Sequence, residues 1–330
     1  MLAWLTTVWT ILNVIAILGV LAYLARLAWP PAEAVRLRNA LLVEPGRGAD
    51  FDWTPSETPP GFRAESRPPS PAFMEALGTL GVDPQADEWT KALAIAAHLS
   101  ERAEDRGPIR ADLATTYRAI RSGYGYCADF AKVFLALAHA AGLAARQWSF
   151  SFDGFGGHGH VVVEVYDRQR GKWLFLDVYN NFHAVDAQTG SPLSALEFRE
   201  AVLGRRAPAL MRANGAGRPG YEFEDKARDY YRRGADEWYL AWGNDVFSYE
   251  ANPAVAWANR VSGSLGQLVA TLLGVHPRIR ILETPENARK VHDVERLGRR
   301  VRWLLGLLAA LIVTLAIQVG SGAGLSRSRT

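Results

Sequence analysis

The stretch Gly123-Tyr-Gly-Tyr-Cys-Ala-Asp-Phe130 places the only cysteine of the chain, Cys127, directly before a strongly amphipathic segment. The apolar residues of this segment recur at helical spacing, and they are Phe130, Phe134, Leu137, Ala138 and Ala141. The sequence therefore predicts a helix with Cys127 in its first turn and an end at Gly142. The two glycines before Cys127 allow a sharp backbone turn. A helix N-terminus favours the thiolate, so this position suits a nucleophile.

Two valine- and leucine-rich segments downstream predict a β-hairpin. Residues 160–166 and 173–178 read as strands, and 168–172 reads as the turn between them. His160 begins the first strand, and Asp177 lies near the end of the second. In an antiparallel pair these two positions can lie side by side, so that the carboxylate orients the imidazole. The sequence thus predicts Cys127, His160 and Asp177 as a catalytic triad.

Other residues compete for the same roles. His158 is a rival base on the same face of the strand, but its glycine-rich surroundings favour a loop or the rim of a substrate cleft. Asn180 or Asn181 could orient the histidine in place of Asp177, as an asparagine does in papain-like proteases. The order of the motif favours Asp177.

Two further polar residues are candidates for the neighbourhood of the site. Glu164 shares the strand face of His160, and it either supports the site or forms a structural salt bridge. Asn244 follows an aromatic segment, and it either lines the cleft or belongs to a turn that ends a helix.

Four segments together resemble the core of the transglutaminase-like superfamily, including bacterial membrane-anchored members. They are Gly125-Tyr-Cys-Ala-Asp-Phe130, Leu137-Ala-His-Ala-Ala-Gly142, His160-Val-Val-Val-Glu-Val-Tyr166 and Gly171-Lys-Trp-Leu-Phe-Leu-Asp177. The resemblance covers roughly residues 110–180. It implies an α+β fold of the papain type, in which a cysteine-bearing helix packs on an antiparallel sheet that carries the histidine and the aspartate. It also implies thiol-dependent acyl transfer, as in amidases, peptidases and protein crosslinkers, without a cofactor. The backbone N–H of Cys127 is one expected oxyanion donor, and Tyr124 is the candidate for the other.

Two uncharged apolar stretches, residues 2–25 and 303–320, are long enough to cross a bilayer. A cleaved signal peptide is the alternative for the first stretch, but no basic residue precedes its long apolar run. A buried core helix is the alternative for the second. Nine Lys and Arg residues flank the spans on the side of the central domain, against two on the other side. We therefore expect a two-pass protein of the bacterial inner membrane, with the central domain in the cytoplasm.

The pattern along the chain predicts seven segments. They are a transmembrane helix with its interface (1–29), an extended proline-rich strap (30–86), a transglutaminase-like catalytic core (87–190), a mostly helical extension (191–283), a basic juxtamembrane helix (284–302), a second transmembrane helix (303–320) and a tail (321–330).

Composition narrows the function further. Among 330 residues with a net charge of +3, the arginines are scattered and form no basic stripe interleaved with aromatics, so we expect no nucleic-acid partner. The histidines lack the spacing of metal ligands, so we expect no metal. The sequence predicts a membrane-tethered cysteine enzyme that acts on a protein or peptide acyl substrate. The alternative is a catalytically inactive module that serves as a docking or scaffold protein in a membrane assembly.

Overall fold

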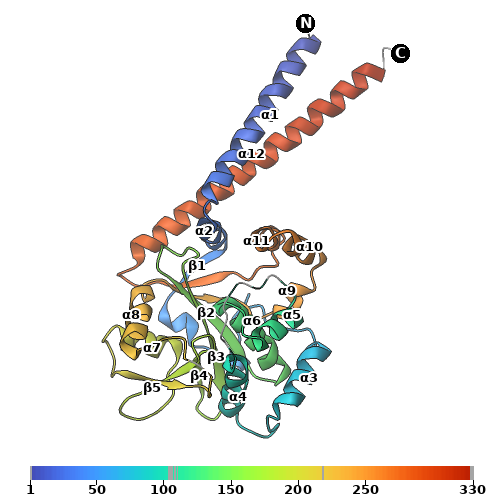
Figure 1. Cartoon of the computed structure of the whole chain (residues 1–330). Helices are drawn as coiled ribbons and strands as arrows, with labels where there is room; N and C mark the ends of the chain where they lie inside the picture. The colour runs from blue at the N-terminus through green and yellow to red at the C-terminus, as the bar shows by residue number, and fades with distance from the viewer. Residues whose placement is uncertain (1, 103–106, 108, 110, 218, 328–330) are drawn as a thin grey trace.

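The computed structural model describes residues 2–102, 107, 109, 111–217 and 219–327. In this part of the chain, helices cover both faces of a central sheet, and two long helices leave one end of the domain together (Figure 1). The predicted α+β class, with a cysteine-bearing helix packed on an antiparallel sheet, is confirmed.

The sheet of the described residues has eight strands in the order β1-β8-β7-β2-β3-β4-β5-β6. Only the β1–β8 pair is parallel among these strands. The strands are β1 (Val43–Gly46), β2 (Ala145–Ser151), β3 (Gly159–Asp167), β4 (Lys172–Asp177), β5 (Phe182–Asp186), β6 (Ala209–Ala213), β7 (Trp238–Ala241) and β8 (Ile279–Leu282). The predicted hairpin is the β3–β4 pair, which occupies the middle of the sheet.

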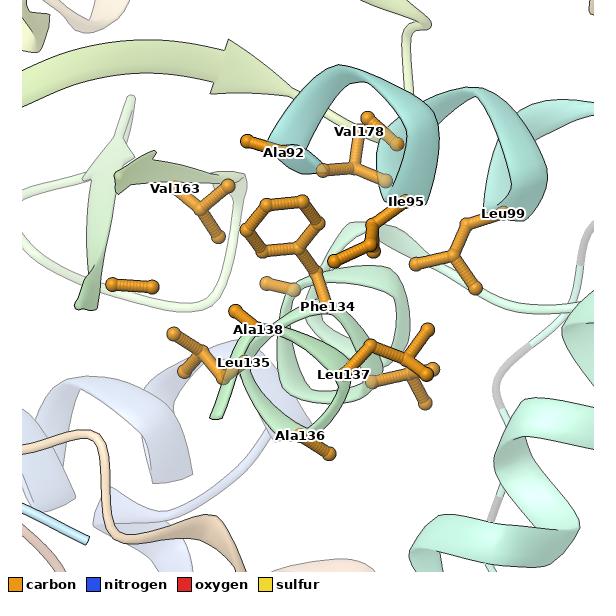
Figure 2. Packing of buried hydrophobic residues seen from close by; sticks show 14 of the residues in the cluster. Ala92, Ile95, Leu99, Phe134, Leu135, Ala136, Leu137, Ala138, Val163 and Val178 are labelled. Atoms are coloured by element: carbon orange, nitrogen blue, oxygen red, sulfur yellow. The ribbon is translucent and has the colours of Figure 1, made fainter. Parts of the chain in front are cut away.

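Helix α6 (Cys127–Ala140) packs against β2 and β3 on one face of the sheet. Phe130, Phe134, Leu137 and Ala138 of the predicted stripe are buried, but all of residues 133–138 are buried as well, so the helix is enclosed on every side there. Phe134 lies at the centre of the resulting core (Figure 2). Helices α3 (Pro71–Leu80), α4 (Glu88–Ser100) and α5 (Leu113–Arg121) surround α6 and bury it. Truncation of a buried Phe such as Phe134 costs about 3–5 kcal/mol, so this packing holds the position of the helix that carries Cys127.

The other face of the sheet carries an aromatic core. Trp148, Phe150 and Phe175 of the sheet pack there with residues of α7 (Ala195–Val202) and α8 (Glu224–Gly234). Phe51 and Trp53, from the proline-rich segment, are buried in the same core.

The sequence predicts an extended proline-rich strap over 30–86, but the structure shows that much of this segment is helical. It contains α2 (Pro31–Leu42) and α3, with short 3-10 turns at Gly48–Phe51 and Pro55–Glu57 between them. Pro31 and Pro71 each stand at the first position of a helix, where the missing N–H costs nothing.

The extension over 191–283 is only partly helical. It contains α7, α8, α9 (Val246–Glu250), α10 (Pro253–Val261) and α11 (Gly263–Leu272), but it also supplies β6, β7 and β8 to the sheet. Through these strands the extension becomes part of the core that holds the hairpin.

The two long helices are α1 (Leu2–Leu27) and α12 (Ala288–Arg327). Within Thr7–Leu27 and Ala288–Gly320, each helix contains an 18-residue stretch with a mean hydropathy of 2.2, which is long and apolar enough to cross a membrane. They pack against each other, and Asn13 Nδ2 donates to the Leu311 carbonyl (3.1 Å) and to Gln318 Oε1 (3.3 Å). The expected juxtamembrane helix, second span and described part of the tail form one continuous helix, which begins at Ala288 rather than at 284. Residues 328–330 of the expected tail and residue 1 of the first span lie outside the described residues.

Candidate active site

Cys127 is the first residue of α6, as the sequence predicts. The turn before it depends on glycine, because Gly123 and Gly125 have φ angles of +97° and +113°. The carboxylate of Asp129 accepts a hydrogen bond from the backbone N–H of Tyr126 (2.9 Å) and so closes the first turn of the helix. The side chain of Cys127 is half-buried.

His160 and Asp177 meet across the β3–β4 pair. Val163 pairs with Leu176, and this register places His160 diagonally opposite Asp177 on one face of the sheet. His160 Nε2 lies 2.6 Å from Asp177 Oδ2. Both side chains are buried, so water does not compete for this contact.

Asp177 is surrounded by further donors. The backbone N–H of Asn180 donates to Oδ1 and its side-chain Nδ2 donates to Oδ2, each at 2.9 Å. The hydroxyl of Tyr231, from α8, also donates to Oδ2. Asn180 Nδ2 lies 3.3 Å from His160 Nε2, so the alternative orienting residue stands beside the carboxylate rather than in its place. Asn181 points elsewhere, since its Nδ2 donates to the carbonyls of Gly215 and Gly217.

The charges around His160 favour its protonated form. Burial alone would lower its pKa, but Asp177 and Cys127 together raise the pKa of His160 to about 10, each through its charge and a side-chain hydrogen bond. Burial would conversely raise the pKa of Asp177, but His160, Tyr231 and Asn180 lower it. His160 is therefore an imidazolium at neutral pH.

A pocket of about 350 Å³ opens beside His160. Its walls are largely aromatic, with Tyr179, Tyr221 and Tyr230 among them, and Asn180 and Lys226 add polar groups. Tyr230 packs against the ring of His160, with 5.8 Å between the ring centroids. Burial raises the pKa of Tyr230, and the charges of Cys127 and Asp177 raise it further.

Residues 79–178 match the family model of the transglutaminase-like superfamily. This segment is a transglutaminase-like superfamily domain. It contains Cys127, His160 and Asp177 and ends one residue after the aspartate. No curated protein and no solved structure matches the chain.

Two of the remaining candidates, His158 and Tyr124, lie in loops. His158 is exposed in the loop before β3, where its Nδ1 lies 2.9 Å from Asp153 Oδ2. Tyr124 precedes the domain's cysteine helix with its side chain 46% exposed. Both lie in loops that flank the transglutaminase-like core elements.

Glu164 and Asn244 make structural contacts. The carboxylate of Glu164 accepts from Arg146 Nε (2.7 Å), Trp148 Nε1 (2.6 Å) and the backbone N–H of Ala195 (2.7 Å), within the aromatic core. Asn244 Nδ2 donates to the Ala145 carbonyl (2.8 Å), and its Oδ1 accepts from the backbone of Glu65 (2.9 Å). Asn244 thus fastens the proline-rich segment to β2.

Sequence reasoning did not single out Tyr230 and Tyr231 as site residues. They lie in α8, outside the segment that matches the transglutaminase-like domain. The signal in the sequence was a pair of adjacent tyrosines among apolar residues that recur at helical spacing over 223–242. Core packing alone also produces this pattern.

Within the described part of the chain, no three His, Cys, Asp or Glu side chains gather as metal ligands. The polar side chains beside His160, those of Asp177, Asn180 and Tyr231, form hydrogen bonds with one another.

Proposed function

We propose that this protein is a membrane-tethered cysteine acyl-transfer enzyme of the amidase, peptidase or transglutaminase type. The observation that carries the proposal is the His160 imidazole, whose Nε2 lies 2.6 Å from Asp177 Oδ2 and whose pKa both Asp177 and Cys127 raise. A transglutaminase-like domain supports thiol-dependent acyl chemistry at the level of the superfamily.

The chemistry follows from the three side chains. The Cys127 thiolate attacks the carbonyl carbon of an amide or ester and forms a tetrahedral intermediate. When the bond from this carbon to the leaving group breaks, His160 donates its proton to the departing amine or alcohol, and a thioester remains on Sγ. Water or an amine then attacks the thioester, His160 accepts a proton from it, the bond between Sγ and the carbonyl carbon breaks, and the Cys127 thiolate is restored beside the imidazolium.

Asp177 keeps the imidazole oriented and stabilises its charge throughout the cycle. An oxyanion on the substrate would face the start of α6, because the N–H of Cys127 is among the first N–H groups of the helix, which have no carbonyl to bond within it. The tyrosine-lined pocket beside His160 would hold part of a peptide acyl substrate.

Tethering is supported by the two apolar helices, whose exposed side chains have no protein to cover them. The excess of basic residues on the domain side of both spans favours a cytoplasmic domain, which we propose for a protein of the bacterial inner membrane.

The test uses the full chain in detergent and an electrophilic acyl probe, with mass spectrometry to locate the adduct. We expect one adduct, on Cys127, and its release by hydroxylamine identifies a thioester. Cys127→Ala should abolish the adduct, and His160→Gln should slow its formation by about 10²–10⁴-fold, the usual range of acid–base catalysis. An unmodified Cys127 in the folded wild-type chain would support the docking or scaffold alternative instead.

A further inference from the structure

Helices α10 and α11 form a hairpin at the end of the domain from which the two long helices leave (Figure 1). Helix α11 packs on α2, which follows α1 and also packs on α12. Arg38 Nη1 of α2 donates to Gln267 Oε1 of α11 at 3.0 Å. The hairpin is therefore built onto the base of the two spans.

The outer face of this hairpin is apolar. Trp257 and Leu272 are 63% and 59% exposed, whereas Ala258 and Ala270 are turned inward and fully buried. The other large exposed side chains of the hairpin and the residue after it are Val261, Leu268 and Leu273. An uncovered patch of this kind on a folded domain marks an interaction surface.

The charge on the hairpin itself is positive and comes from one residue. Residues 251–282 contain no Asp or Glu, and Arg260 is exposed on the same hairpin. Exposed apolar side chains that include a tryptophan, with one cation and no anion among them, suit contact with the interface of an anionic bilayer.

We infer that the α10–α11 hairpin docks on the surface of the bilayer that α1 and α12 cross, as a third membrane contact of the chain. This inference rests on the proposed membrane tethering, because the spans hold the patch next to lipid. Continuity with the spans selects lipid over a second copy of the chain, since the patch adjoins their base through α2.

The contact would also set the height and direction of the active site. Besides α11, helix α2 holds the loop that leads into His160: Gly157 N donates to the Ala32 carbonyl (3.1 Å), and Asn39 Nδ2 donates to the Phe155 carbonyl (2.7 Å). A hairpin seated on lipid would fix α2, and with it the catalytic strand, relative to the membrane plane.

Because Cys127 is the only cysteine of the chain, its replacement leaves a protein that can be labelled at one introduced cysteine. In full-length protein with Cys127→Ala, an environment-sensitive NBD dye is attached at Trp257→Cys or Leu272→Cys. The control sites are Met74→Cys, exposed on α3, and Trp9→Cys, exposed on α1. Each protein is placed in nanodiscs of phosphatidylcholine and phosphatidylglycerol, with or without nitroxide-labelled phosphatidylcholine.

We expect the dyes at 257 and 272 to emit at shorter wavelength than the dye at 74 and to lose most of their emission to the lipid nitroxide. Quenching at position 9, with the dyes at 257 and 272 behaving like the dye at 74, would overturn the docking inference and leave tethering intact. Absence of quenching at position 9 would overturn both. A blue shift at 257 and 272 without nitroxide quenching would show a protein partner on the patch, and would also overturn the inference.

Discussion

Tyr231 and His160 share one oxygen atom of Asp177. The Tyr231 hydroxyl donates to Oδ2, the same atom that lies 2.6 Å from His160 Nε2. Burial and the neighbouring carboxylate raise the pKa of Tyr231 well above its ordinary value, so the phenol remains a donor at any working pH. Helix α8 thus completes the environment of a carboxylate that lies on β4.

Tyr231→Phe removes a hydrogen bond to a buried charge. We expect a loss of about 1.5–3 kcal/mol in the free energy of unfolding, measured by urea titration of the full chain in detergent. Tyr230→Phe is the matched control, because the hydroxyl of Tyr230 makes only a 3.4 Å contact with the Gly159 carbonyl. Equal losses in the two variants would contradict a special role for the bond to Asp177.

Asp177→Asn removes the charge that contributes most to raising the pKa of His160. Burial then lowers this pKa, so less imidazolium is present at pH 7 to stabilise a thiolate. We expect iodoacetamide to alkylate Cys127 at least about tenfold more slowly at pH 7, because each pKa unit corresponds to a factor of ten in protonation. The rate is measured by mass spectrometry of the intact protein.

Asp153→Asn is the matched control for this change. Asp153 lies 2.9 Å from His158 Nδ1, so the variant disturbs the exposed His–Asp pair of the chain and leaves the buried one in place. We expect an unchanged alkylation rate. A slower rate in this variant would point to His158 as the base.

The raised pKa of His160 also makes stability depend on pH. The folded state holds a proton on His160 up to about pH 10, whereas the unfolded chain loses it near pH 6.5. The folded state binds more protons between these values, so the stabilising effect is complete below about pH 6.5 and declines as the pH rises toward 10. We expect the difference in unfolding free energy between wild type and His160→Gln to shrink by about 1.4 kcal/mol per pH unit in this window. Urea titrations at a series of pH values measure it, and a difference that stays constant would refute the assigned charge.

Local patterns predicted the parts of the site that come from single elements. The helical spacing after Cys127 and the valine- and leucine-rich composition of two segments indicated α6 and the β3–β4 pair, because both patterns reflect buried positions. The order of the motif then placed His160 beside Asp177.

Other parts of the fold and of the site depend on contacts between segments that are far apart in the sequence. Aromatic and apolar residues recur at helical spacing over 223–242, as in a single helix, but α8 ends at Gly234 and Trp238–Ala241 forms β7. Aromatic residues suit both structures, and the antiparallel pairing of β7 with β2 and β8 decided the outcome. The position of Tyr231 against Asp177 depends on this tertiary arrangement, so no local pattern could reveal it.

The turn before α6 offers a test of how the thiol is positioned. Gly125 has a φ angle of +113°, and an added Cβ would lie 3.2 Å from Phe130 and 3.3 Å from Ile109 and Ile120. Gly125→Ala combines backbone strain with overpacking, and we expect it to cost about 2–5 kcal/mol of unfolding free energy. It should also slow alkylation of Cys127, because the first turn of α6 must shift to relieve the contacts.

Gly142→Ala separates the effect of backbone strain from the effect of overpacking. Gly142 also has a positive φ, +71°, but an added Cβ would meet nothing within 4 Å. We expect this variant to lose only about 1–2 kcal/mol, the cost of the left-handed conformation alone, and to alkylate at the wild-type rate. If both variants lose the same stability and keep the same alkylation rate, then packing around Gly125 does not position Cys127, and the placement of the thiol must depend on α6 itself.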